Sequence, residues 1–226
     1  MGRVKIQRGV FVFLALLSVS CRSTYPRPAF AAPPGNLSSG SVLRGFRSEW
    51  PESGTVRHSA VLDFRGIRVP ALGMSSFDSA RGDAALAMFS TTGMKILQVE
   101  SRGGRLGWDF RLNGIKEQKK AAENLIGDVK GIFIHPPGPA DYRVFRGSGL
   151  VLGWRDSSGG LVELVFGVPV NSVDGKARLM EKFSFKDGRI ERSVFYYEYP
   201  GGSALPSRIR MENYRSGYNL TLKSIP

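Results

Sequence analysis

Few side chains in this sequence have the types and spacing that catalysis or metal binding requires. The chain of 226 residues contains two histidines, His58 and His135, and a single cysteine, Cys21. Either histidine could act as a general base, but the sequence offers neither a nucleophile elbow nor a paired-carboxylate motif for it to serve. One cysteine excludes an internal disulfide and a cysteine-rich zinc site, and two histidines leave little room for other metal chemistry. We therefore expect a non-enzymatic protein without cofactor or metal, and a hydrolase is the least favoured alternative.

The positive charge of the chain favours anionic partners. There are 32 Lys and Arg against 19 Asp and Glu, and 22 of the positive residues are arginine, whose guanidinium binds phosphate through two hydrogen bonds. Lipid head groups are therefore sensible contacts. The arginines are scattered from Arg44 to Arg215, so a solvated basic surface without a specific site remains the simpler interpretation. No recognition helix or stacking motif is present, and we expect no nucleic-acid partner.

The first twenty residues have the pattern of a secretory signal peptide. Arg3, Lys5 and Arg8 form a positive start without acids, and the apolar run 9–17 follows. This run is shorter than the about 20 residues that span a bilayer. We expect residues 1–20 to direct export and to lie outside the folded domain.

The cysteine stands where the apolar run ends. Leu17–Cys21 (LSVSC) resembles a bacterial lipobox, in which the cysteine is lipidated and becomes the mature N-terminus; Ser18 departs from the aliphatic residue usual three places before it. Cleavage at Ala29–Ala31 is the second interpretation, and an uncleaved anchor is the third. By the same resemblance Arg22, standing where an aspartate would signal inner-membrane retention, favours the periplasmic face of the outer membrane.

A tether is predicted between this cysteine and the folded domain. Within residues 21–41, the stretch 22–40 holds four prolines, two glycines and four Ser or Thr residues, with few large apolar groups. Such a composition is typical of a linker, and as a flexible coil it would span roughly 25 Å. One domain is then expected over 42–226.

Short apolar runs separated by turns predict a mainly antiparallel β domain. The expected strands are 42–49, 55–64, 71–77, 84–89, 95–100, 105–110, 142–145, 150–155, 161–166, 179–186, 189–199, 207–213 and 218–224. Asp187-Gly188 suits a tight hairpin turn. Alternation places Leu106, Trp108 and Phe110 on one face of their strand.

One segment has helical rather than strand periodicity. Ile115, Ala122, Ile126 and Val129 recur at helical spacing, and Gly131 offers a stop. The sequence therefore predicts a single helix inserted between two runs of strands.

This order of elements resembles the LolA/LolB family of periplasmic lipoprotein carriers. The closest local likenesses are Ala84–Val99 (AALAMFSTTGMKILQV) and Leu205–Met211 (LPSRIRM) followed by Gly217–Leu222 (GYNLTL). The resemblance implies an incomplete antiparallel β-barrel of about eleven strands capped by a helix, with an apolar cavity for lipid or lipoprotein acyl chains. In one branch of the family an apolar residue at the tip of an early turn assists transfer into the membrane. Here Thr92 takes that place, with Met94 as the nearest apolar neighbour.

Such a cavity would be lined by apolar side chains from the strands and the helix. The candidates are Leu72, Met74, Phe77, Leu86, Met88, Leu97, Val99, Leu106, Trp108, Phe110, Ile126, Val129, Phe183 and Phe185. The alternative is that these residues fill a closed core. We expect an outer-membrane lipoprotein, anchored through Cys21, that binds or transfers acyl chains; the alternative is an assembly lipoprotein of the same fold that acts through another envelope protein.

Overall fold

Most of the folded part of the chain belongs to one antiparallel sheet. The computed structural model describes residues 26–33, 38–64, 66–111, 117–155, 159–170, 172 and 174–225. The signal peptide, Cys21 and Ile115 lie outside these residues. The described strands are β1 (Phe30–Ala31), β2 (Ser53–Phe64), β3 (Ile67–Asp78), β4 (Asp83–Phe89), β5 (Lys95–Arg102), β6 (Arg105–Phe110), β7 (Tyr142–Arg146), β8 (Gly149–Arg155), β9 (Leu161–Pro169), β10 (Arg178–Lys186), β11 (Arg189–Tyr197), β12 (Arg208–Asn213) and β13 (Tyr218–Ser224).

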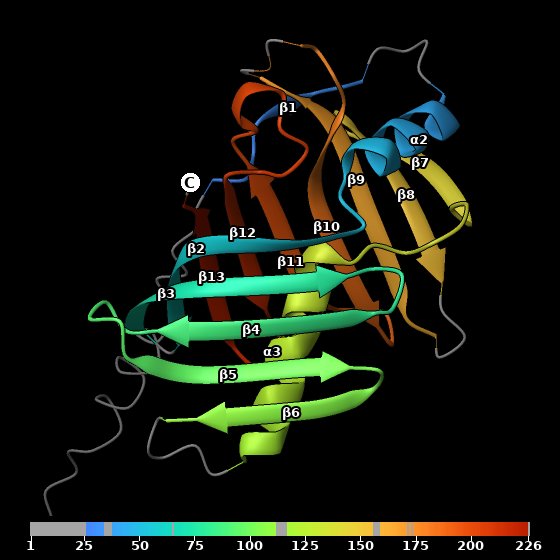
Figure 1. Ribbon diagram of the computed structural model, residues 1–226. Helices are drawn as coiled ribbons and strands as arrows, with labels where there is room; N and C mark the ends of the chain where they lie inside the picture. The colour runs from blue at the N-terminus through green and yellow to red at the C-terminus, as the bar shows by residue number, and fades with distance from the viewer. Residues whose placement is uncertain are drawn as a thin grey trace, which may run out of the picture.

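The sheet forms an incomplete barrel around one helix. Its strand order is β6-β5-β4-β3-β2-β13-β12-β11-β10-β9-β8-β7, so the path ends at β6 and β7 without closing. Figure 1 shows β2–β6 on one side of helix α3 (Gln118–Phe133) and β10–β13 on the other. We call the face towards α3 the inner face and the opposite one the outer face. The predicted fold class is confirmed.

The strand predictions hold with one exception. Residues 42–49 form helix α2 (Ser39–Glu49) rather than a strand. Ser38 caps this helix, because its hydroxyl accepts a hydrogen bond from the backbone N–H of Ser41 at 3.1 Å. Val42, Leu43 and Phe46 then share one helical face, which packs against the rest of the molecule. The strand prediction is wrong here because a short apolar run does not distinguish a strand from a helix.

Helix α3 begins and ends close to its predicted limits. It continues two residues past the predicted stop at Gly131, because Ile132 and Phe133 are each 1% exposed and complete its apolar face. The ring of Phe133 stacks on that of Phe77, with centroids 4.9 Å apart. Trp50, which ends α2, donates from its indole nitrogen to the Phe133 carbonyl oxygen at 3.1 Å. These contacts tie both helices to the inner face.

The Asp187-Gly188 turn has the predicted conformation. Asp187 has φ 51° and Gly188 has φ 73°, the two positive values that a type I′ hairpin turn needs. The turn joins β10 to β11, where Lys186 pairs with Arg189. This hairpin prediction is confirmed.

Part of the expected tether lies on the sheet. Strand β1 pairs with β9, and the Phe30 ring lies so close to Gly167 that a Cβ there would come within 2.2 Å of it. The Tyr197 hydroxyl donates to the Pro26 carbonyl oxygen at 3.1 Å. The structure therefore places residues 26–33 against the outer face, and α2 begins at Ser39, before the predicted domain start at residue 42.

No helix among the described residues has the length and apolar content needed to cross a membrane. Within the same ranges, no group of three or more His, Cys, Asp or Glu side chains is placed to hold a metal ion.

Candidate functional site

An apolar cavity of about 310 Å³ lies between helix α3 and the inner face of the sheet. Its lining comes from α3, β2–β6, β13 and the turn that precedes β13. The residues are His58, Ala60, Leu62, Val69, Ser75, Leu86, Met88, Ile96, Leu97, Phe110, Ala121, Asn124, Leu125, Asp128, Val129, Ile132, Ser216, Tyr218, Leu220 and Leu222. Aliphatic and aromatic side chains make up most of this surface.

Strand and helix periodicity bring these side chains together. Leu62 pairs with Leu220 and Ala60 with Leu222 across the β2–β13 ladder, so alternate residues of both strands face the cavity. On the opposite wall Leu125, Val129 and Ile132 follow each other at helical spacing and share one face of α3. The lining stretch of the helix, 121–132, is about 17 Å long at about 1.5 Å per residue.

The cavity is more accessible at one end than at the other. Val69 is 38% exposed, and Asn124 and Ser216 are partly exposed. His58 and Ser75 are each 1% exposed. These exposures place the mouth near the β2–β3 turn and leave His58 in the interior.

His58 is a neutral side chain held by one hydrogen bond. Its Nε2 lies 2.9 Å from Ser75 Oγ. Burial lowers the pKa of His58 to about 4, so the ring is uncharged at neutral pH. Among the described residues no partner is found for its buried Nδ1. A Ser–His pair is also the core of a hydrolytic site, in which a third group bonds the histidine at Nδ1; no described residue does so here.

Asp128 projects from α3 towards strands β11 and β12. Its Oδ1 accepts from Arg192 Nε at 2.7 Å and from Asn213 Nδ2 at 2.9 Å. Burial raises the pKa of this carboxyl to about 6, against the opposing effect of Arg192. Its Oδ2 is buried and has no partner in the described part of the chain.

Tyr218 also has a buried polar atom without a partner among the described residues. Its buried hydroxyl makes no hydrogen bond to any described residue. A buried polar group without a partner costs about 1–3 kcal/mol, and few occur in a native domain. Three of them, on His58, Asp128 and Tyr218, line one apolar cavity, which marks it as the candidate functional site.

Five of the predicted residues line the cavity between α3 and the sheet. They are Leu86, Met88, Leu97, Phe110 and Val129. Phe77, Val99, Leu106, Trp108 and Ile126 do not line the cavity. Of these, Phe77, Val99 and Ile126 are buried in the main core, Leu106 packs against that core, and Trp108 faces inward opposite Val99 on the edge strand β6 with 41% exposure.

The other four predicted residues are on the outer face. Leu72 and Met74 are 41% and 43% exposed there. Phe183 packs with Val151 and Val165 in a separate outer cluster, which Phe30 and Phe185 flank. In β3 the residues alternate as predicted, but alternation does not tell which of the two faces is the inner one. In β10 a bulge between Leu179 and Glu181 interrupts the alternation, so that Leu179 lies in the main core and Phe183 in the outer cluster.

Sequence analysis missed the contribution of β2 and β13. Ala60, Leu62, Leu220 and Leu222 line the cavity and were not among the predicted residues. Their alternation along both strands was the available signal. His58 was considered only as a catalytic base.

The other histidine lies outside the cavity. The ring of His135 is 4.6 Å from that of Trp50 and 5.1 Å from that of Phe46. Burial holds the pKa of His135 well below its usual value, and the Lys182 charge lowers it further. Lys182 Nζ lies 3.5 Å from His135 Nδ1 and donates to the Ile134 carbonyl oxygen at 2.7 Å. This is an interior packing contact rather than an accessible site.

The predicted membrane-transfer residues lie in the turn between β4 and β5. Met94 is 69% exposed. The Ser90 hydroxyl lies 2.8 Å from that of Thr92 and accepts from the backbone N–H of Met94 at 3.1 Å. The turn is thus internally hydrogen-bonded and presents Met94 to the surroundings.

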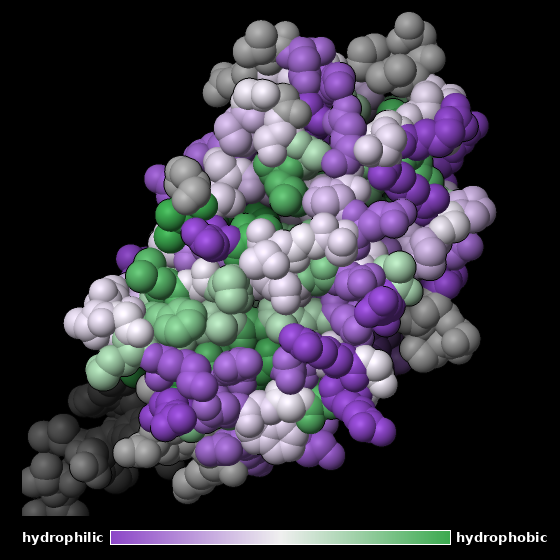
Figure 2. All heavy atoms as spheres, in the orientation of Figure 1, coloured by the Kyte–Doolittle hydropathy of each residue, from purple (hydrophilic) through white to green (hydrophobic). Residues whose placement is uncertain are grey.

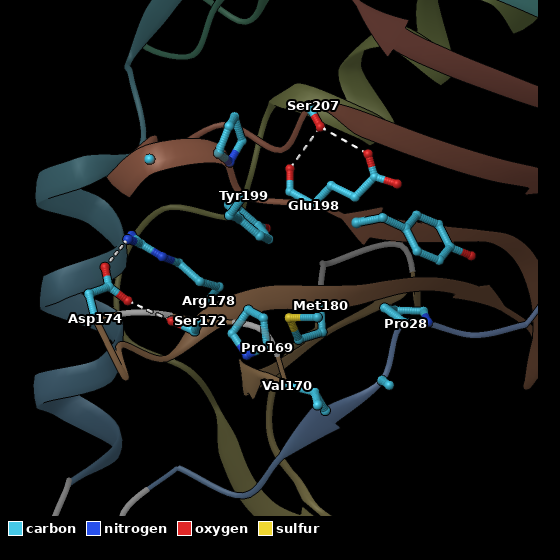
Figure 3. A pocket seen from close by; sticks show the side chains of 14 residues that line it. Pro28, Pro169, Val170, Ser172, Asp174, Arg178, Met180, Glu198, Tyr199 and Ser207 are labelled. Atoms are coloured by element: carbon cyan, nitrogen blue, oxygen red, sulfur yellow. Dashed lines mark hydrogen bonds and ion pairs between the residues drawn. The ribbon is translucent and has the colours of Figure 1, made fainter.

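A second hollow of about 1000 Å³ opens between residues 28–29 and the ends of β9–β11 (Figure 3). Its charges already have partners: Arg178 Nη2 lies 2.7 Å from Asp174 Oδ2, and Arg178 also bonds Glu49. Ser207 donates to the Glu198 carbonyl oxygen at 2.9 Å. None of the described residues that line this hollow has a buried polar atom without a partner, so we assign the candidate site to the inner cavity.

Comparison with known proteins gives likenesses of fold. No protein-family model matches the chain, and no curated protein matches it. Among solved structures, a LolA superfamily protein from Nitrosomonas europaea is similar at TM-score 0.52 and 14% identity, over 84% of this chain and 92% of that one. A DUF1329 family protein from Desulfovibrio piger has TM-score 0.42 and 8% identity, with 81% and 88% covered. A domain named as an outer membrane lipoprotein-sorting protein, from Vibrio parahaemolyticus, has TM-score 0.35 and 11% identity, with 82% and 89% covered.

The first of these likenesses spans most of both chains. It shows that the incomplete barrel around α3 has the fold of the LolA superfamily. At 14% identity the likeness concerns the fold alone. The predicted resemblance to LolA/LolB-like proteins is confirmed at that level.

Proposed function

We propose that this protein binds an acyl chain of a lipid or lipoprotein in the cavity between α3 and the sheet, without catalysing a reaction. The observation that carries the proposal is the apolar cavity itself, enclosed by α3 and six strands of a LolA-like fold. An acyl chain gains roughly 0.8 kcal/mol for each methylene that leaves water, so an apolar cavity is sufficient to hold one.

The size and lining of the cavity favour a single chain. Ligand cavities are usually about 300–1,000 Å³, and the volume of about 310 Å³ is at the lower end. Met88 lines it, and the flexible thioether of methionine adapts to chains of different shape. The Ser75–His58 hydrogen bond pairs two polar side chains in the wall of the cavity, which is compatible with binding an acyl chain there.

An outer-membrane location with a lipid on Cys21 completes the proposal. Residues 26–33 are docked on the outer face of the sheet, so the linker from Cys21 to the folded domain is shorter than the composition suggested. Five residue steps separate Cys21 from Pro26, and a fully extended chain covers at most about 18 Å over that distance. The domain would therefore stay close to the membrane.

A second candidate function, assembly with another envelope protein, is favoured by the outer face. Val61, Leu72 and Met74 lie on neighbouring strands and are 39%, 41% and 43% exposed. Figure 2 shows apolar residues gathered over β3 and β4 on the side that faces the viewer. Contiguous apolar surface of this kind often marks a protein contact.

The test is titration of the purified, delipidated protein with a fluorescent acyl probe whose end group is uncharged, a fatty-acid methyl ester. We expect saturable binding that Ala60→Leu weakens, because Ala60 is 2% exposed and lines the cavity. Ala85→Leu is the matched control, since Ala85 lies on the opposite face of β4 from Leu86. A flat titration of the wild type would contradict the proposal. Recovery of a specific protein partner without co-purified lipid by mass spectrometry would favour the second candidate.

A further inference from the structure

We propose that Asp128 and Tyr218 form a polar subsite that binds an uncharged hydrogen-bond donor of the ligand, a hydroxyl or an amide N–H. The cavity would then select neutral amphiphiles over fatty carboxylates and phosphates. This inference rests on the proposed function, because it concerns the polar group of the same bound molecule.

The two side chains belong to the same end of the cavity. Asn213 pairs directly with Tyr218 in the β12–β13 ladder, and Asn213 Nδ2 donates to Asp128 Oδ1 at 2.9 Å. The Asn213 side chain therefore bonds the Asp128 carboxylate from the β12 position that pairs with Tyr218 on β13. Asp128 Oδ2 and the Tyr218 hydroxyl, both without a partner in the described part of the protein, remain for a ligand.

An apolar stretch leads from this end into the interior. From Tyr218 towards the interior, the β2–β13 ladder pairs Leu220 with Leu62 and then Leu222 with Ala60. The next inward-facing pair is Ser224 with His58. Six residues separate position 218 from position 224, which is about 20 Å at about 3.3 Å per residue. The polar subsite lies towards the accessible end, beside Ser216, and this stretch offers room for a hydrocarbon tail.

The Asp128 side of the subsite is held in place by hydrogen bonds. Asp128 is 1% exposed and is fixed by Arg192 from β11 and Asn213 from β12. Its remaining oxygen can only accept while the carboxyl is ionised. The Tyr218 hydroxyl can donate or accept, so a ligand hydroxyl can bond to both.

Charge explains the selection against anions. Arg192 Nε lies 2.7 Å from Asp128 Oδ1, so the nearest positive charge is already neutralised. The titratable side chains lining the cavity are His58, Asp128 and Tyr218, and His58 is uncharged at neutral pH. A carboxylate or phosphate buried beside the Asp128–Arg192 ion pair would find no unpaired positive charge among the described residues that line the cavity, and an unpaired charge in an apolar site is strongly unfavourable.

The experiment compares three ligands of equal chain length as competitors of the fluorescent probe: 1-dodecanol, methyl dodecanoate and dodecanoate, at pH 7.5. On wild-type protein we expect the alcohol to displace the probe up to about tenfold better than the ester, the range that one net hydrogen bond allows. Dodecanoate should be the weakest of the three. Tyr218→Phe and Asp128→Asn should each reduce the preference for the alcohol over the ester.

Tyr218→Phe is the main variant, because it removes a hydroxyl with no partner among the described residues and should leave the fold intact. Tyr214→Phe is its matched control: this tyrosine lies in the same β12–β13 connection, is 44% exposed and donates to Glu212 Oε2 at 2.5 Å. Equal affinity for alcohol and ester, or strongest binding of dodecanoate, would overturn the inference while leaving acyl-chain binding in place. If none of the three displaces the probe and the probe itself does not bind, the proposed function fails instead.

Discussion

Gly73 lies directly across from His58 in the β2–β3 ladder, and a Cβ at position 73 would come within 2.1 Å of His58 Cε1. The imidazole ring thus occupies space that only glycine leaves free. Because the same ring is held by Ser75 at 2.9 Å, the glycine and the serine together set the position of the histidine in the cavity.

Gly73→Ala should therefore destabilise the protein by about 1–3 kcal/mol, the usual cost of overpacking a buried site. Urea unfolding measures the change. Gly54→Ala is the control in the same strand pair, because its Cβ would meet the Phe77 ring at an ordinary distance of 3.5 Å. Equal effects of the two substitutions would contradict the assigned role of Gly73.

Gly45→Ala should stabilise the protein by roughly 0.5–1 kcal/mol, because alanine restricts the unfolded chain and suits a helix interior. Gly45 is exposed within α2, and a Cβ there meets nothing within 4 Å. Thermal or urea unfolding provides the measurement. No gain in stability would count against a helix at 39–49 and for the strand that the sequence analysis predicted.

Lys182 should make the stability depend on alkaline pH. It is 3% exposed, and burial lowers its pKa to about 7, whereas the lysine of an unfolded chain titrates near 10.4. Between these values the unfolded state binds more protons, so the free energy of unfolding rises with pH. Urea unfolding at pH 7, 8 and 9 should give a steeper rise for the wild type than for Lys182→Met. Parallel curves would show that Lys182 is charged in the folded protein.

Met94→Ser should weaken binding of the protein without its N-terminal lipid to vesicles by about threefold or more. Half-immersion of the methionine side chain contributes about half of the roughly 1.5–3 kcal/mol that complete burial gives, and Met94 is 69% exposed at the base of the β4–β5 turn, next to β5. Co-sedimentation with anionic vesicles measures the bound fraction. Met74→Ser on the outer face is the control, and an equal loss with that variant would refute a specific role of the turn.

Cys21→Ala should abolish acylation and release the protein from membranes, if the LSVSC segment is a lipobox. Metabolic labelling with a fatty acid and membrane fractionation measure the two effects. Ser18→Leu restores the usual aliphatic residue and should leave acylation intact or increase it. A Cys21→Ala protein that stays membrane-bound would exclude the lipid as the sole anchor.

Much of the fold could be predicted because its signals are local. Turn residues with a conformational requirement mark the ends of strands, as Asp187-Gly188 does with φ 51° and 73°. The alternation of Leu106, Trp108 and Phe110 places them on one face of β6, where each pairs with β5. The helical spacing of Ala122, Ile126 and Val129 identified α3.

The sequence predictions that were wrong have two kinds of physical cause. At 42–49 the apolar run was too short to distinguish strand from helix, and the cap at Ser38 together with packing against the core decided for the helix. In β8–β10 both faces are covered, the inner by the core and the outer by residues 26–33. Gly149–Trp154 is buried at every position, so alternation cannot assign faces in strands buried on both sides.

The sequence by itself determined where strands β2–β13 and helix α3 lie, whereas export and lipid binding stay predictions. Only the tertiary structure decided where the cavity is and which side chains line it. The reason is that a cavity depends on the separation between α3 and the sheet, which contacts distant in sequence fix, such as Asp128 with Arg192 and Trp50 with Phe133. For the same reason no local pattern could show that the Asp128 and Tyr218 polar atoms share one apolar space.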